Sequence, residues 1–154
     1  MAKQRAGITS DLHRQLAVDL FNSTWALIDK EDRTVADNDL MIHSAHASAY
    51  HWLQVGEPLN FERSHWQISR VYALLEQPEA ALYHAQRCLQ ICEDEGIGDF
   101  DLAFAYEALA RAYSIGGDNE KAAMFAEKAR GAGENIKRKD DRDYFFAELG
   151  TVET

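Results

Sequence analysis

The chain has 154 residues and carries 26 acidic against 16 basic side chains, a formal net charge of −10. This balance argues against nucleic acid as a main partner, because a surface that binds phosphates has to be basic. No segment is apolar for long enough to span a bilayer, and the charged residues 1–7 precede no apolar stretch, which argues against a signal peptide. We therefore expect a cytoplasmic protein that contacts neither nucleic acid nor membrane.

Apolar residues recur at helical spacing through nearly the whole chain, and no stretch shows sustained strand alternation. This pattern predicts seven helices and no sheet. In chain order, the expected helices cover residues 10–30, 38–55, 60–76, 78–94, 99–115, 118–132 and 140–149. Polar residues that can accept a backbone N–H bond are the expected helix caps, namely Thr9 or Ser10, Asn60, Asp99 and Asp118. Pro78 suits a first helical turn, where its missing N–H is not needed.

Residues 68–89 are repeated by residues 109–129 at an offset of 41. Identical residues recur at five matched places: Arg70 and Arg111, Tyr72 and Tyr113, Glu79 and Glu120, Ala81 and Ala122, and Ala85 and Ala126. A repeat of this length is typical of stacked helical hairpins.

These residues resemble the tetratricopeptide repeat (TPR) family, in which a large, a small and an aromatic residue of one helix meet small residues of the next. The matching residues are Ile68, Ser69, Tyr72, Ala81, Ala85 and Cys88 in one unit, and Leu109, Ala110, Tyr113, Ala122, Ala126 and Ala129 in the next. Gly117-Asp118 fits the family's turn, whereas Gln77-Pro78 departs from it. The family period is about 34 residues. The longer link at residues 93–99 resembles the long-period arrays of kinesin light chains and bacterial regulators.

The resemblance implies an all-α, right-handed solenoid of about three helical hairpins with a C-terminal capping helix. Residues 1–154 would form one TPR-like domain. Its expected parts are clear repeats at 60–94 and 99–133, a degenerate first hairpin at 10–55 and a cap at 138–150 that uses Tyr144, Phe145 and Leu149. Residues 43–52 and 61–89 are also similar to a group of bacterial proteins, a likeness that brings no activity with it.

Stacked hairpins place the first helix of each unit on one concave surface. Carried over to this chain, the expected binding groove consists of Trp66, Arg70, Leu74, Glu107, Arg111 and Ser114. Two guanidinium groups at matched places suit a carboxylate or phosphate partner, because each offers a planar fork of donors. The alternative is that each arginine pairs with a neighbouring carboxylate such as Glu107 and holds the stack together.

The second and third predicted helices carry four candidate metal ligands. These are His43, His46, Glu62 and His65, and the last two have the i, i+3 spacing of carboxylate–histidine sites in helical bundles. None of these spacings is diagnostic, so no metal or other cofactor is expected. A second set, His84, Cys88 and Cys92, is spaced four apart. Here Cys88 occupies a close-contact position, which favours packing over ligation.

The sequence thus predicts a protein- or peptide-binding adaptor or scaffold, not an enzyme, with an acidic segment as the expected ligand and no catalytic residue assigned. One alternative is a metal- or small-ligand-binding helical protein, or an enzyme, that uses the histidine-rich second helix and the third helix. Another is self-association as a homodimer. Two or three hairpins make a short groove, so affinity for one peptide should be modest unless the protein dimerises.

Overall fold

The computed structural model describes residues 7–154, and within this range the chain is helical throughout, with no strand. The helices are α1 (Ser10–Ile28), α2 (Val35–Val55), α3 (Pro58–Leu74), α4 (Pro78–Glu95), α5 (Asp99–Ile115), α6 (Asn119–Glu134) and α7 (Lys139–Leu149). The prediction of an all-helical chain is confirmed. The observed helix ends lie within three residues of the predicted ones.

Several helices begin where the polar residues predict. The hydroxyl of Thr9 and the carboxylate of Asp118 each accept the N–H three residues further on, 3.1 Å away in both cases. The second helix begins three residues earlier than expected, at Val35. Thr34 and Asp37 form a capping box there, in which each side chain accepts the other's backbone N–H, and this extends the helix backwards.

Two of the predicted caps are wrong. Asn60 is already the third residue of α3, and its side-chain oxygen accepts the N–H of Glu57 at 3.0 Å, so the helix starts earlier, at Pro58. Asp99 is the first residue of α5 and has a positive φ of 55°. Its carboxylate accepts the N–H of Lys137 at 3.1 Å, so it anchors the link between α6 and α7 instead of capping its own helix.

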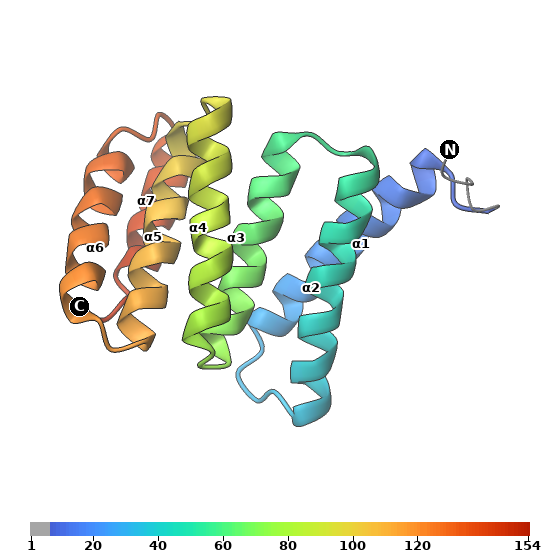
Figure 1. Ribbon diagram of the computed structural model, residues 1–154, viewed down its shortest axis with the longest axis horizontal. Coiled ribbons are helices and arrows are strands. Elements are labelled where there is room, and N and C mark those ends of the chain that lie inside the picture. The colour runs from blue at the N-terminus through green and yellow to red at the C-terminus, as the bar shows by residue number, and fades with distance from the viewer. Residues whose placement is uncertain (1–6) are drawn as a thin grey trace.

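The helices stack as hairpins in chain order, from α1/α2 at one end to α5/α6 at the other (Figure 1). Each hairpin also packs on the next, through α2 with α3, α4 with α5, and α6 with α7. In addition α1 contacts α3, α3 contacts α5 and α5 contacts α7, whereas α2, α4 and α6 make no such contacts among residues 7–154. The array is therefore curved, and α1, α3, α5 and α7 line its inner face.

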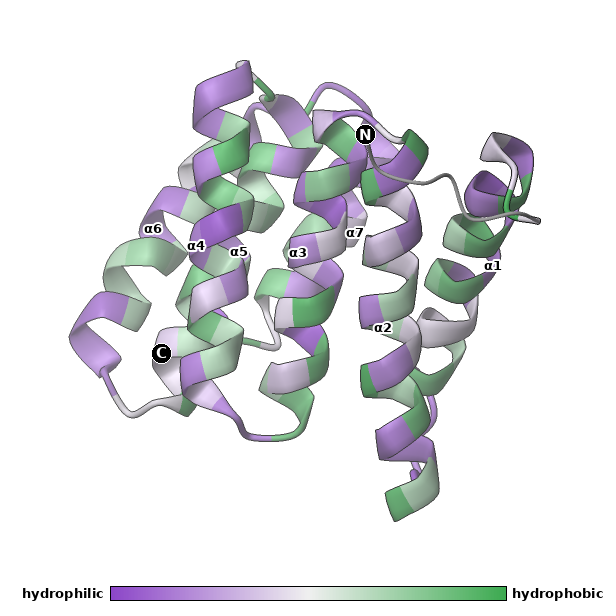
Figure 2. Ribbon diagram, turned by 45° about the vertical axis from the view of Figure 1, so that its right-hand side comes forward, coloured by the Kyte–Doolittle hydropathy of each residue, from purple (hydrophilic) through white to green (hydrophobic). Residues whose placement is uncertain are grey.

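Small residues bring the two helices of each repeat together. Ala81 and Ala85 of α4 are fully buried, and Ala122 and Ala126 of α6 are at most 5% exposed. Their burial confirms the predicted close-contact positions, because an alanine lets neighbouring helices approach further than a longer side chain would. Hydrophilic and hydrophobic residues alternate along the helices (Figure 2), as expected when each helix has a buried and a solvated side.

The last helix, α7, covers the end of the core but not with all three residues expected. Phe145 and Leu149 are buried, together with Phe104 and Ile136. Tyr144 is 46% exposed, contrary to expectation. Successive residues of a helix point about 100° apart, so Tyr144 cannot share the buried face that the i, i+4 residues occupy. Within residues 7–154, none of the helices combines the length and the apolar character needed to cross a membrane.

Candidate functional site

Two arginines from successive repeats meet on the inner face. Arg70 lies on α3 and Arg111 on α5, and both reach the carboxylate of Glu107, which is 1% exposed. The Arg111 Nε donates to Glu107 Oε1 at 2.8 Å, and the Arg70 Nη1 lies 3.6 Å from the same oxygen. The alternative interpretation of the sequence, in which the arginines pair with Glu107, therefore describes part of the arrangement.

The C-terminal segment supplies the remaining partners of both arginines. The Arg70 guanidinium donates to the carboxylate of Glu148, which lies on α7. The Arg111 Nη2 donates to the backbone oxygen of Glu148 at 3.2 Å and to the hydroxyl of Thr151 at 2.8 Å. The two arginine side chains are only 14% and 15% exposed. A carboxylate of the chain itself thus occupies the place predicted for an acidic ligand.

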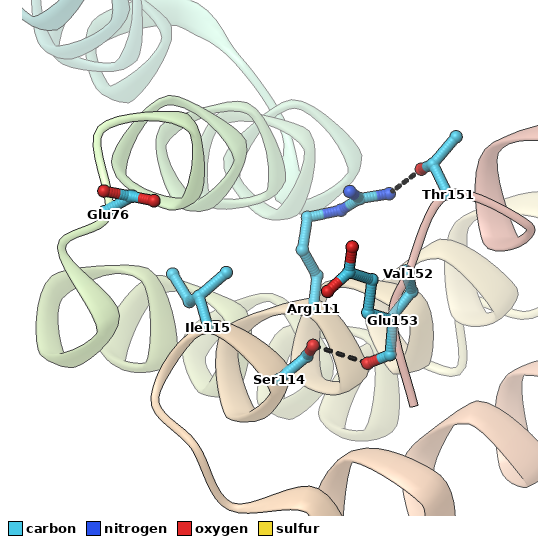
Figure 3. A pocket seen from close by; sticks show the side chains of 7 residues that line it. All are labelled: Glu76, Arg111, Ser114, Ile115, Thr151, Val152 and Glu153. Carbon is cyan, nitrogen blue, oxygen red and sulfur yellow. Dashed lines mark hydrogen bonds between the residues drawn. The ribbon is translucent and has the colours of Figure 1, made fainter.

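The end of the inner face is an open hollow of about 560 Å³ between α5 and the chain terminus. Its lining residues are Glu76, Arg111, Ser114, Ile115, Thr151, Val152 and Glu153. Figure 3 shows Arg111 reaching Thr151 and Ser114 reaching Glu153, whose backbone oxygen accepts the Ser114 hydroxyl at 2.5 Å. Leu74, which was also predicted to line the groove, lies at the end of α3 with 36% of its surface exposed.

A second hollow of about 410 Å³ on the inner face is mostly aromatic. It is lined by Phe21, Trp25, Asp29, Arg63, Trp66, Phe100 and Tyr144. The Trp66 ring lies between those of Trp25 and Phe104, with centroids 5.2 Å and 5.0 Å away. Trp66 also borders the small gap beside Arg70 and Arg111, so it joins the aromatic hollow to the arginine pair.

The four predicted metal ligands do not converge. His46 Nε2 lies 2.9 Å from the Tyr72 hydroxyl, and His65 Nδ1 lies 2.8 Å from His84 Nδ1. Glu62 faces two cysteines of α4 instead. Within residues 7–154, no group that contains a histidine brings three ligand atoms within 4.8 Å of one another. His43 is exposed on α2.

The partly buried pair of His65 and His84 leads to a prediction about pH. Burial, with Arg87 nearby, lowers the pKa of His65 to about 4, and burial with His65 nearby lowers that of His84 to about 4. Between pH 6.5 and pH 4 the unfolded chain binds more protons at these sites than the folded chain, so stability falls as the pH falls. Because both rings are partly exposed, solvent weakens the effect, and from pH 7 to pH 5 we expect a loss of about 1 kcal/mol per histidine.

Urea unfolding at pH 7, 6 and 5 measures this loss, and a His84→Gln variant separates it from other groups. Separation is needed because burial, with Asp101 nearby, raises the pKa of Glu62 to about 10. A carboxyl group with a raised pKa stabilises the folded protein at low pH, and this contribution is lost as the pH rises, which is the opposite direction to the histidines. The variant should lose less stability than the wild type on acidification. Equal losses in the two proteins would contradict the histidine assignment.

Several residues that line or contact the inner face lie outside the two repeats, so the repeat pattern did not identify them. Glu148, Thr151 and Glu153 follow the second repeat, and Phe21 and Trp25 precede the first. Their role depends on how strongly the stack curves, since curvature is what brings α7 within reach of α3. The only sequence signal for any of these residues is the helical spacing of Phe21 and Trp25 in α1. The same spacing is expected of an ordinary buried helix face, so it does not identify a site.

Hairpins that stack into a curved array are the architecture of a class, the helical-repeat proteins. Residues 61–134, which run from α3 to the end of α6, match the tetratricopeptide repeat family. The protein is therefore a TPR-like helical repeat protein, and the repeats support a general role in protein–protein interaction. The chain has no match among curated proteins or among solved structures.

Proposed function

We propose that the protein is an adaptor whose inner groove binds an acidic segment of a partner protein, with Arg70 and Arg111 as the anion-binding residues. The observation that carries this proposal is the carboxylate of Glu148, which already lies on Arg70. This contact supports a groove in which Arg70 binds the carboxylate of an adjoining chain segment. The expectation that both arginines point into one groove rests on the same contacts.

Local charge favours an acidic ligand at this place. With Glu107, the two arginines retain one net positive charge, and Glu148 neutralises it. The rest of the protein is acidic, so an anionic segment is repelled elsewhere, and the arginine pair attracts it once the Glu148 carboxylate has moved away. A partner carboxylate can replace that of Glu148, while Phe145 and Leu149 keep α7 in place through their burial.

The aromatic hollow adds a second element of recognition. Trp66 borders both this hollow and the arginine pair, so one bound segment can place an apolar side chain against the rings and a carboxylate on the arginines. We therefore expect the partner segment to combine acidic with aromatic or aliphatic residues. The intramolecular contacts compete with it, and competition of this kind lowers the apparent affinity.

The chain's own C-terminal segment is the sharpest probe of this groove. We would remove residues 150–154 and replace Glu148 by Gln, then add a labelled peptide of residues 147–154 and follow its fluorescence anisotropy. We expect saturable binding with a Kd on the order of 0.1–1 mM, as for a short flexible ligand with few contacts. The full-length wild type should bind the same peptide at least about tenfold more weakly, since its site is filled.

Charge reversal provides the matched control. Arg70→Glu with Arg111→Glu in the shortened protein should abolish peptide binding while helicity by circular dichroism persists. Arg138→Glu, at a residue whose side chain is 74% exposed, should leave binding unchanged. If the peptide does not bind to the shortened protein, the C-terminal contacts serve only to close the stack, and the groove proposal fails. Exchange of this segment between two copies would appear as a concentration-dependent dimer in sedimentation experiments.

A further inference from the structure

A buried cluster of one carboxylate and two thiols lies between the two helices of the first repeat, next to α5 and away from the groove. Glu62 of α3 faces Cys88 and Cys92 of α4, and each of the three residues is at most 1% exposed. Glu62 Oε2 lies 3.3 Å from Cys88 Sγ and 3.7 Å from Cys92 Sγ. One ligand atom from each residue lies within 4.8 Å of the others.

We propose that Glu62, Cys88 and Cys92 form a binding site for a thiophilic divalent cation of the Zn²⁺ class. Tetrahedral zinc has bonds of about 2.3 Å to sulfur and about 2.0 Å to carboxylate oxygen, which place neighbouring sulfur and oxygen ligands about 3.5 Å apart. The two sulfur–oxygen distances in the cluster lie on either side of this value. Thiolates favour zinc and similar ions over magnesium and calcium.

The carboxylate of Glu62 is poorly accounted for by packing alone. As a carboxylate its buried Oε1 has no hydrogen-bond donor, and only a protonated Glu62 can bond to the neighbouring carboxylate of Asp101. Arg63 does not supply a donor, because its Nε lies 3.8 Å from Oε1 and its guanidinium donates to both oxygens of Asp101, at 2.7 Å and 3.1 Å. A buried polar atom without a partner is unfavourable. A cation held between the carboxylate and the thiols would compensate for that cost.

Protonation and charge are consistent with an exchange of protons for a cation. Without a cation, burial and the neighbouring Asp101 raise the pKa of Glu62 to about 10, and the hydrogen bond with Cys92 together with burial raises the pKa of the Cys88 thiol. Glu62 and Cys88 would then hold protons at neutral pH, whereas the hydrogen bond with Cys88 lowers the pKa of the Cys92 thiol, which favours the thiolate that a cation needs. A bound dication releases the protons. Its two charges offset two of the three negative charges of one carboxylate and two thiolates, and one remains because Arg63 already pairs with Asp101.

The fourth ligand position is expected to involve α5. Asp101 is the nearest further carboxylate, and its side chain is 12% exposed, which gives water and ions access to this end of the cluster. A cation here would link α3 and α4 of the first repeat to α5 of the second. It would therefore stiffen the junction between two hairpins without occupying the groove, and this proposal stands or falls independently of the groove.

Titration of full-length, tag-free protein with Co²⁺ and Zn²⁺ tests the site. Thiolate ligation of Co²⁺ gives a charge-transfer band in the near-ultraviolet, and we expect it to saturate at one equivalent per chain. One equivalent of Zn²⁺ should abolish the band and raise the Tm by about 5 °C or more. If wild-type protein shows neither the band nor a Tm shift, the cluster is a protonated packing network and the proposal is wrong.

Three variants locate the ligands. Glu62→Gln keeps the shape of the side chain and should weaken Co²⁺ binding at least about tenfold, since it removes one of three charged ligands. Cys92→Ser should weaken or abolish the charge-transfer band. Glu79→Gln, at an exposed position of α4, is the matched control and should bind as the wild type does. The assignment would be overturned if Glu62→Gln bound Co²⁺ as the wild type does, or if replacing His65 abolished binding. Both results can be obtained even if Cys92→Ser fails to fold.

Discussion

Replacing Phe145 by alanine is expected to lower the free energy of unfolding by about 3–5 kcal/mol. The ring is fully buried and meets Phe104 edge to face, with centroids 4.9 Å apart. It also packs directly on α6, where a Cβ added at Gly133 would lie only 2.3 Å from the Phe145 Cε1 atom. Such close packing leaves little room for the surroundings to collapse into the space that alanine would open.

Tyr144→Ala is the matched control for this change. The neighbouring tyrosine removes a ring of similar size from the same helix, but it is 46% exposed, so we expect a loss of about 1 kcal/mol or less. Urea unfolding followed by circular dichroism measures both variants. If the two losses were similar, Phe145 would not anchor α7, and the burial of the last helix would have to depend on Phe146 and Leu149 alone.

Glu107→Ala is expected to destabilise the protein by about 3–5 kcal/mol, because it removes one partner from a buried ionic cluster and leaves two guanidinium groups with the single carboxylate of Glu148. Glu107 is 1% exposed, and both arginine side chains are at most 15% exposed, so water cannot replace the lost contact fully. Its Oε1 serves Arg70 and Arg111 at once, which links the two repeats.

An exposed ion pair in the same hairpin gives the comparison. Glu127 pairs with Arg130 at i, i+3 on α6, where the two side chains are 74% and 48% exposed. Glu127→Ala should change stability by about 0.5 kcal/mol or less, since exposed pairs contribute little. Replacing Glu107, Arg70 and Arg111 together by apolar residues should recover much of the stability lost by Glu107→Ala. Equal effects of Glu107→Ala and Glu127→Ala would show that the inner cluster is solvated.

The helices and their pairing were predictable because their signals are local. Thr9 and Asp118 start helices by accepting a backbone N–H from the next turn, Pro78 fits a first turn because that turn needs no N–H from it, and the alanines of α4 and α6 recur at helical spacing. Asn60 was misjudged by three residues within the same local signal, since its side chain accepts the N–H of Glu57 from inside the helix, whereas Asp99 was misjudged because of a distant contact. Asp99 has the residue type of a helix cap, but Lys137, 38 positions away, takes its carboxylate.

The candidate groove was partly predictable. The repeat predicted that Arg70 and Arg111 would occupy equivalent places, and the structure brings them to one carboxylate, that of Glu107. Glu148 could not be predicted, because no sequence rule relates it to Arg70, 78 residues away. The predicted histidine site was wrong for a related reason, because residues that are close in sequence can have different partners. His65 and Glu62 lie one turn apart on α3, yet His65 pairs with His84 and Glu62 with the cysteines.

The sequence alone therefore determined the helical class, the pairing of α3 with α4 and of α5 with α6, and the small residues that bind these helices together. These features depend on contacts within a turn or between adjacent helices, and a periodic pattern records such contacts. Only the tertiary structure decided that Glu148 fills the arginine pair and that Glu62 meets Cys88 and Cys92. Both depend on the curvature and the rotation of successive hairpins, which arise from the packing of the whole array and leave no period in the chain.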